Sequence, residues 1–106
     1  MQYIKYQQGD VILQQVSEEE FNKSNQTSYK IVAHKTRAVL AEGEATGHYH
    51  AVYMEDMLDN AGITLCKNNE YDRQNRGIIV TGASVELKHE EHHTITLEPG
   101  FYLQRI

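Results

Sequence analysis

Short runs of β-forming residues, each ended by a turn signal, recur at fairly regular spacing and constrain the fold more than any other feature of the sequence. The runs are residues 11–16, 29–33, 36–41, 48–54, 63–66, 77–81, 83–88, 93–97 and 101–106. No segment keeps a helical period, and only residues 17–21, which begin with a capping-box spacing, predict a helical turn. The sequence therefore predicts an all-β fold, either a small barrel or a sandwich.

The length and charge of the chain limit the number of domains it can form and the kinds of partner it can bind. The 106 residues suffice for one hydrophobic core, so we expect a single β-rich domain over residues 1–106. The net charge is -5 with histidines neutral, and the ten Lys and Arg residues are scattered, which argues against a nucleic-acid partner. No apolar run approaches the roughly 20 residues that cross a bilayer, so we expect no membrane partner. The start shows no secretory signal pattern, and a cytoplasmic location is the expectation.

Cys66 is the one cysteine, which excludes an internal disulfide and suits a reducing compartment. It lies in an apolar run, residues 63–66. We expect it to be a small buried hydrophobic residue rather than a catalytic thiol.

The histidines are distributed unevenly, since five of the six fall within residues 48–50 and 89–93. On a strand, His48 and His50 point to the same face with their Cα atoms about 6 to 7 Å apart, close enough for both to bind one ion. His89 is the best third candidate, because it continues the apolar face of the preceding run. We therefore predict a divalent transition metal site with His48, His50 and His89 as ligands.

The rest of the second cluster leaves alternatives open. In a regular strand His92 and His93 point to opposite faces, so only one of them joins the site; we take His92 as the candidate ligand. Glu90 and Glu91 are expected to form the tight connection before them. A carboxylate here would bind the metal, orient a histidine or act as a base, and Glu91 is the candidate for the catalytic role.

The first cluster resembles the first cupin motif, in which a glycine is followed by His-x-His, then a glutamate, then a second glycine. Here His48 and His50 are followed after four residues by Glu55 and after six more by Gly62, while Gly43 is the leading glycine. The resemblance implies a cupin-like double-stranded β-helix.

The ligands that the cupin resemblance implies are His48, His50 and Glu55, completed by a later histidine, at the position of His89 or His92. The resemblance is limited to the first motif. The second cupin motif places Pro-x-Gly before its histidine, whereas Pro99 and Gly100 follow the second cluster here.

A broader resemblance covers most of the chain. The segments 8–11, 41–50, 87–92 and 99–102, with the pattern AEGEATGHxH…HEEH, look like a group of short uncharacterised bacterial and phage proteins. This implies a common site around the same histidines. It also brings Glu44 close to the first cluster, as a second candidate for the catalytic carboxylate and an alternative to Glu55.

Three kinds of function remain open at this point. One is a small metal-dependent enzyme or small-molecule binder that holds Zn, Fe, Mn or Ni. A second is metal-free chemistry, in which a histidine is the general acid or base and a nearby glutamate orients it. The third is a non-enzymatic accessory, interaction or structural protein whose histidines are structural. Because a small β fold has exposed sheet edges, pairing of two edges in a homodimer is expected.

Overall fold

The computed structural model describes residues 5–9, 11–24, 27–31, 37–42, 49–67 and 76–105. Its strands are β1 (Lys5–Gln8), β2 (Val11–Val16), β3 (Thr27–Ile31), β4 (Arg37–Glu42), β5 (Tyr49–Tyr53), β6 (Gly62–Lys67), β7 (Arg76–Thr81), β8 (Val85–His89), β9 (His92–Leu97) and β10 (Gly100–Arg105). One helix, α1 (Glu18–Lys23), and one 3-10 turn, η1 (Met54–Asp56), complete the described elements.

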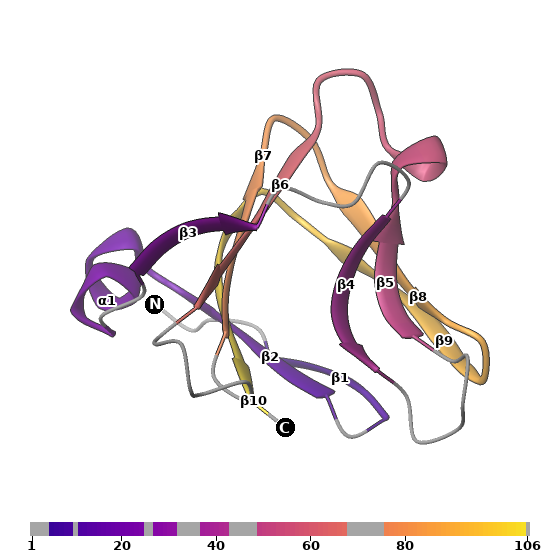
Figure 1. Cartoon of the computed structure of the whole chain (residues 1–106), viewed down its shortest axis with the longest axis horizontal. Helices are drawn as coiled ribbons and strands as arrows, with labels where there is room; N and C mark the ends of the chain where they lie inside the picture. The colour runs from indigo at the N-terminus through magenta and orange to yellow at the C-terminus, as the bar shows by residue number, and fades with distance from the viewer. Residues whose placement is uncertain are drawn as a thin grey trace.

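The strands form two antiparallel sheets that face each other (Figure 1). One sheet has the order β1-β2-β10-β7-β6-β3, and the other has the order β4-β5-β8-β9. The all-β prediction is confirmed. Among the strands described, pairing stays within each sheet, so the architecture is a sandwich and not a closed barrel.

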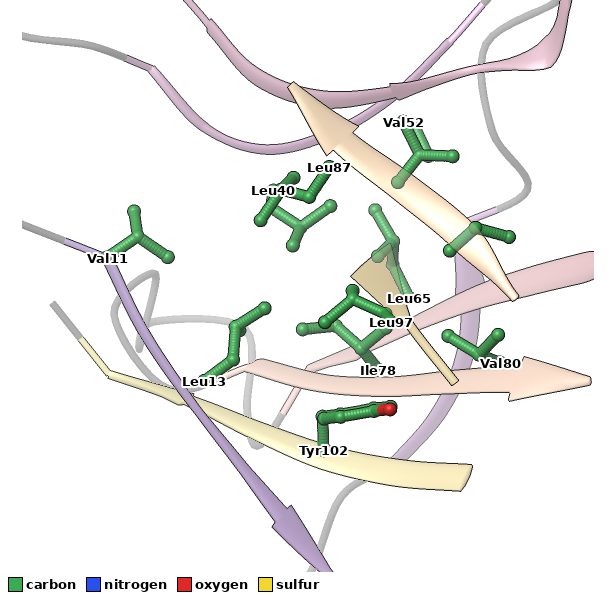
Figure 2. Packing of buried hydrophobic residues seen from close by; sticks show 12 residues of the cluster. Val11, Leu13, Leu40, Val52, Leu65, Ile78, Val80, Leu87, Leu97 and Tyr102 are labelled. Carbon is green, nitrogen blue, oxygen red and sulfur yellow. The ribbon is translucent and has the colours of Figure 1, made fainter. Parts of the chain in front are cut away.

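The main core fills the space between the sheets, because alternate side chains of each strand point inward. Figure 2 shows side chains of the first sheet, among them Leu13 and Tyr102, packed toward Leu40 and Leu87 of the second. Burial raises the pKa of the Tyr102 hydroxyl, which donates to the carbonyl of Glu98. None of the helices in the described segments is long and apolar enough to cross a membrane.

A second, smaller core lies on the outer face of the larger sheet, under α1. Ser17 is the N-cap of the helix. Its Oγ accepts from the amide of Glu20 at 3.1 Å, as the capping-box spacing predicts. Its buried Phe21 packs with Cys66 in this core. Burial raises the pKa of the Cys66 thiol, which keeps it protonated, and its expected role as a buried hydrophobic residue is confirmed.

Most predicted strands lie within a few residues of the observed ones. The polar stretch 22–28 of the sequence is typical of a loop, but the helix extends to Lys23 and β3 starts at Thr27. The polar stretch 68–76 is also typical of a loop; residues 68–75 lie outside the described residues, and Arg76 is the first residue of β7. Among the described strands, the one that the sequence did not predict is β1, and it supplies a central residue of the candidate site.

The central core predicts the effect of shortening a buried leucine. Leu97 has no exposed surface, so Leu97→Ala should lower the free energy of unfolding by about 2–5 kcal/mol, because it removes apolar contacts and leaves a cavity. Glu86→Gln, on the exposed face of the neighbouring strand, is the control and should change the stability by less than about 0.5 kcal/mol. Urea denaturation measures both. Equal, small effects of the two variants would mean that Leu97 does not lie in the core.

Candidate functional site

The buried polar side chains of the described segments gather at one end of the sandwich. They are Gln8 at the end of β1, His50 near the start of β5 and Gln104 near the end of β10, with exposed fractions of 2%, 1% and 1%. The start of β5 and the turn between β8 and β9 both lie at the lower right of Figure 1. Because buried polar groups need hydrogen-bond partners, this end of the core requires hydrogen bonds between side chains and backbone as well as apolar packing.

Gln8 ties the two sheets together there. Its Nε2 donates to the carbonyl of Leu87 at 3.0 Å and to the carbonyl of His93 at 2.8 Å. Its Oε1 lies 2.9 Å from Nδ1 of His50. One side chain of the first sheet thus holds three strands of the second.

These contacts assign the proton of the His50 ring. Because Nε2 of Gln8 donates to two carbonyls, the oxygen of the amide must face His50, and an amide oxygen only accepts. His50 Nδ1 therefore donates to it. In the neutral ring this leaves the lone pair on Nε2, the tautomer that the hydrogen-bond network selects.

Three imidazole rings meet at this end. The ring centres are 4.3 Å apart for His50 and His89, 4.6 Å for His89 and His92, and 6.1 Å for His50 and His92. His50 comes from β5, whereas His89 and His92 are opposite each other across the two-residue turn between β8 and β9. The structure thus brings together three of the four histidines predicted as ligands.

An irregularity in β9 explains why His92 joins the cluster. Between the pairs Leu87↔Ile95 and His89↔His92 the chain advances two residues on β8 and three on β9, so β9 carries an extra residue. This β-bulge shifts the alternation of side chains, which allows His92 to face the cluster although Leu97 also points inward. The side chain of His93 is exposed, and its backbone carbonyl accepts a hydrogen bond from Nε2 of Gln8.

The two glutamates of the tight turn contact the cluster through hydrogen bonds. Oε2 of Glu90 accepts from the amide of Tyr49 at 3.0 Å, which links the turn to the start of β5. The backbone amide of Glu91 donates to Nδ1 of His89 at 3.0 Å. A neutral His89 ring therefore carries its proton on Nε2, opposite to His50.

Gly9 lets the turn after β1 pass close to the rings. Its φ of +60° lies in the left-handed region, which favours glycine. A Cβ at this position would be 2.8 Å from Nε2 of His92 and 3.3 Å from Cε1 of His50. The absence of a side chain here is what allows the two rings to lie against the backbone.

Gln104 makes a second link between the sheets. Val39 pairs with Ala51 and Ala41 with His50, so Leu40 is an extra residue in β4, and its carbonyl accepts from Nε2 of Gln104 at 3.0 Å. Oε1 of Gln104 is the one buried side-chain polar atom in the described segments that has no hydrogen-bond partner. A second bulge thus lies beside the histidine end of the core.

Three predicted site residues are not placed in the cluster. His48 and Glu44 lie outside the described residues. Glu55 is exposed in η1, at the opposite end of β5 from His50, and the three residues from His50 to Tyr53 alone span about 10 Å. There it contributes, after the hydrogen bond from Lys88 to Asp56, to raising the pKa of Lys88.

The sequence reading did not identify Gln8 or Gly9 as site residues. The signal that points to Gln8 is the alternation in β1, where Tyr6 packs against the main core and Gln8 is the next residue on that face. A polar residue on an inward face requires a buried partner, which here is His50.

The arrangement does not form a finished metal centre. In the described part of the chain no group of three or more His, Cys, Asp or Glu side chains is placed to hold a metal ion. The rings of His50 and His92 are nearly parallel, at 10°, and Nδ1 of His89 faces the amide of Glu91. Ion binding would require the ring nitrogens to be brought closer to one common point.

The close packing of Gly9 predicts a local effect of substitution. Gly9→Ala places a side chain in the left-handed region, at a cost of about 1–2 kcal/mol, and pushes a methyl group against His92. We expect a lower free energy of unfolding and shifted ring resonances of His92 and His50, measured by denaturation and by NMR.

Gly82→Ala is the matched control for Gly9→Ala. Gly82 also has a positive φ, of +78°, and a Cβ there would clash with the carbonyl of Asn60. This variant should lose stability but leave the histidine resonances unchanged. If Gly9→Ala also left the histidine resonances unchanged, this result would contradict the close packing of Gly9 against the rings.

Comparison with known proteins adds a family but no activity. The model of a family described as "Domain of unknown function (DUF8820)" matches residues 7–106. Neither the curated proteins nor the solved structures gave a match. Any function must therefore be argued from the site itself.

Proposed function

The chain belongs to the DUF8820 family, and we propose that it binds one divalent transition metal ion through His50, His89 and His92. The observation that carries the proposal is the meeting of these three rings from β5 and the β8–β9 turn. Imidazoles are the commonest nitrogen ligands for such ions, and of these three His50 is buried, His89 half-buried and His92 exposed.

The spacing of the rings supports the proposal. Three imidazole nitrogens about 2.1 Å from one tetrahedral ion place the ring centres roughly 5 Å apart. The centre distances of 4.3, 4.6 and 6.1 Å lie on both sides of that value. Rotation of side chains, without movement of the strands, would then bring the nitrogens toward one point.

Metal binding has a specific consequence at His89. Its Nδ1 accepts from the amide of Glu91, and binding through Nε2 requires the ring proton to move to Nδ1, which breaks that hydrogen bond. Binding through Nδ1 displaces the same amide. In either case the turn between β8 and β9 responds to the ion.

The number of ligands decides the kind of site. Three histidines leave a tetrahedral ion one open position, where water is activated or an oxygen-rich small molecule binds, with Glu91 or Glu44 as the base. The cupin resemblance adds His48, which as a fourth ligand would close the site. A set of imidazoles suits Zn, Fe and Ni better than Mn.

A second candidate is a protein without metal whose histidines are structural. The hydrogen bond from His50 to Gln8, together with the absence of a ready ligand set among the described residues, favours it. Such a protein would act as an accessory or interaction factor. Metal titration separates the two candidates.

The cluster predicts how neighbouring histidines differ in metal binding. We expect the wild-type protein to take up about one equivalent of Zn²⁺ or Co²⁺, measured by calorimetric titration. His92→Ala should weaken the affinity at least 100-fold, which exceeds the 10–100-fold loss typical of a supporting residue, because it removes a ligand.

His93→Ala is the matched control for metal binding. Both side chains are exposed in β9 and adjacent in the sequence, but the ring contacts with His50 and His89 are made by His92. His93→Ala should therefore bind as the wild type does. Absence of uptake by the folded wild-type protein would remove the metal proposal and leave the structural alternative.

The expected homodimer also remains a proposal. In the described segments β3 and β4 are outer strands of the two sheets, and a second copy that paired with one of them would extend that sheet. Light scattering at micromolar concentration should then give twice the monomer mass. The mass of a monomer would contradict this prediction.

A further inference from the structure

We infer that Gln8 is a positioning residue that commits His50 to bind the metal through Nε2 and not through Nδ1. The inference rests on the proposed metal site. It concerns the atom that binds, which the sequence pattern around the histidines does not specify.

The orientation of the Gln8 amide is fixed by two independent strands. Its two N–H donors are used by the carbonyls of Leu87 in β8 and His93 in β9. Turning the amide over would place its oxygen against both carbonyl oxygens and its nitrogen against His50. Both strands would lose a hydrogen bond, so Oε1 stays directed at Nδ1 of His50.

Burial strengthens the hydrogen bond between Oε1 of Gln8 and Nδ1 of His50. Gln8 is 2% exposed and His50 is 1% exposed, so water has little access to compete for Nδ1. In a medium of low dielectric constant the hydrogen bond is stronger, and loss of either partner leaves a buried polar atom unsatisfied. The ring of His50 is therefore held in one tautomer and in one orientation.

The result is the arrangement that supports histidine ligands in metal proteins. A histidine that binds a metal through one nitrogen usually donates its other ring N–H to an oxygen, which fixes the ring and raises the basicity of the binding atom. Here Oε1 of Gln8 is that oxygen. Nε2 of His50 is then the binding atom.

Gln104 offers a matched comparison within the same molecule. It too is a buried glutamine at this end, and it also links the sheets by a hydrogen bond to a carbonyl, that of Leu40. Its amide is bonded to the backbone of β4 and not to a histidine ring. Removal of either amide should reduce stability, but only removal of Gln8 should alter His50.

The first test is the tautomer of His50 in the metal-free protein, read from long-range ¹H–¹⁵N NMR spectra. In the wild type and in Gln104→Met, Nδ1 should show the shift of a protonated nitrogen and Nε2 that of an unprotonated one. In Gln8→Met this pattern should be lost, either to the other tautomer or to an average. A wild-type ring protonated on Nε2, or a Gln8→Met ring that keeps the pattern, overturns the inference.

A second variant covers the case in which Gln8→Met does not fold. Gln8→Glu keeps an oxygen that accepts from Nδ1 but loses the donors to Leu87 and His93. We expect the wild-type tautomer of His50 in a less stable protein. A folded Gln8→Glu variant with the proton on Nε2 would show that the acceptor does not set the tautomer.

The second test is Zn²⁺ titration of the same variants. Gln8→Met should weaken binding 10–100-fold, the usual effect of losing a partner of a ligating histidine, whereas Gln104→Met should bind as the wild type does. Equal affinity of the Gln8 variant and the wild type overturns the inference while metal binding stands. No uptake by the wild type overturns the proposed function, and with it the ligating role of Nε2, whichever tautomer NMR reports.

Discussion

The amide of Gln8 is the interaction on which the histidine end of the sandwich depends. Apolar packing between two sheets is non-directional, whereas hydrogen bonds require a set geometry. The three hydrogen bonds of this buried amide, to Leu87, His93 and His50, therefore fix β1 relative to three strands of the second sheet at the histidine end. They place β1 against β9 and orient the ring that lies deepest in the cluster. The position of the strands and the chemistry of the site therefore follow from the same contacts.

Two of the three register shifts in the described strand pairs, those in β4 and β9, lie beside the histidine cluster, and the third is between β3 and β6. The bulge in β4 directs the carbonyl of Leu40 to Gln104, and the bulge in β9 brings His92 to the cluster while the carbonyl of His93 reaches Gln8. Bulges are common beside functional sites, because one extra residue redirects a side chain without breaking the sheet. In the described pairing of the larger sheet around the main core, β2, β10, β7 and β6 are regular.

The sequence predicted the all-β class, the capped start of α1, the burial of Cys66 and the tight turn at Glu90 and Glu91. These features depend on local propensity and on alternation with a period of two, which are visible in a single sequence. It did not predict β1, because the run Lys5–Gln8 is polar and its strand character comes from pairing with β2. It took His92 as the candidate ligand, but the alternation of a regular strand gave no physical reason to prefer His92 over His93. That choice depends on a bulge set by tertiary hydrogen bonds to Gln8, which no local pattern specifies.

We propose that Nε2 of His50 is a metal ligand at the histidine end of the sandwich. Crystals grown with Zn²⁺ and measured at its absorption edge test it most directly, because an anomalous difference map locates the ion without assumptions about the ligands. We expect a peak about 2.1 Å from Nε2 of His50, with the rings of His89 and His92 turned toward it. A peak bonded to Nδ1 of His50, or zinc only at sites away from the three histidines, would contradict it.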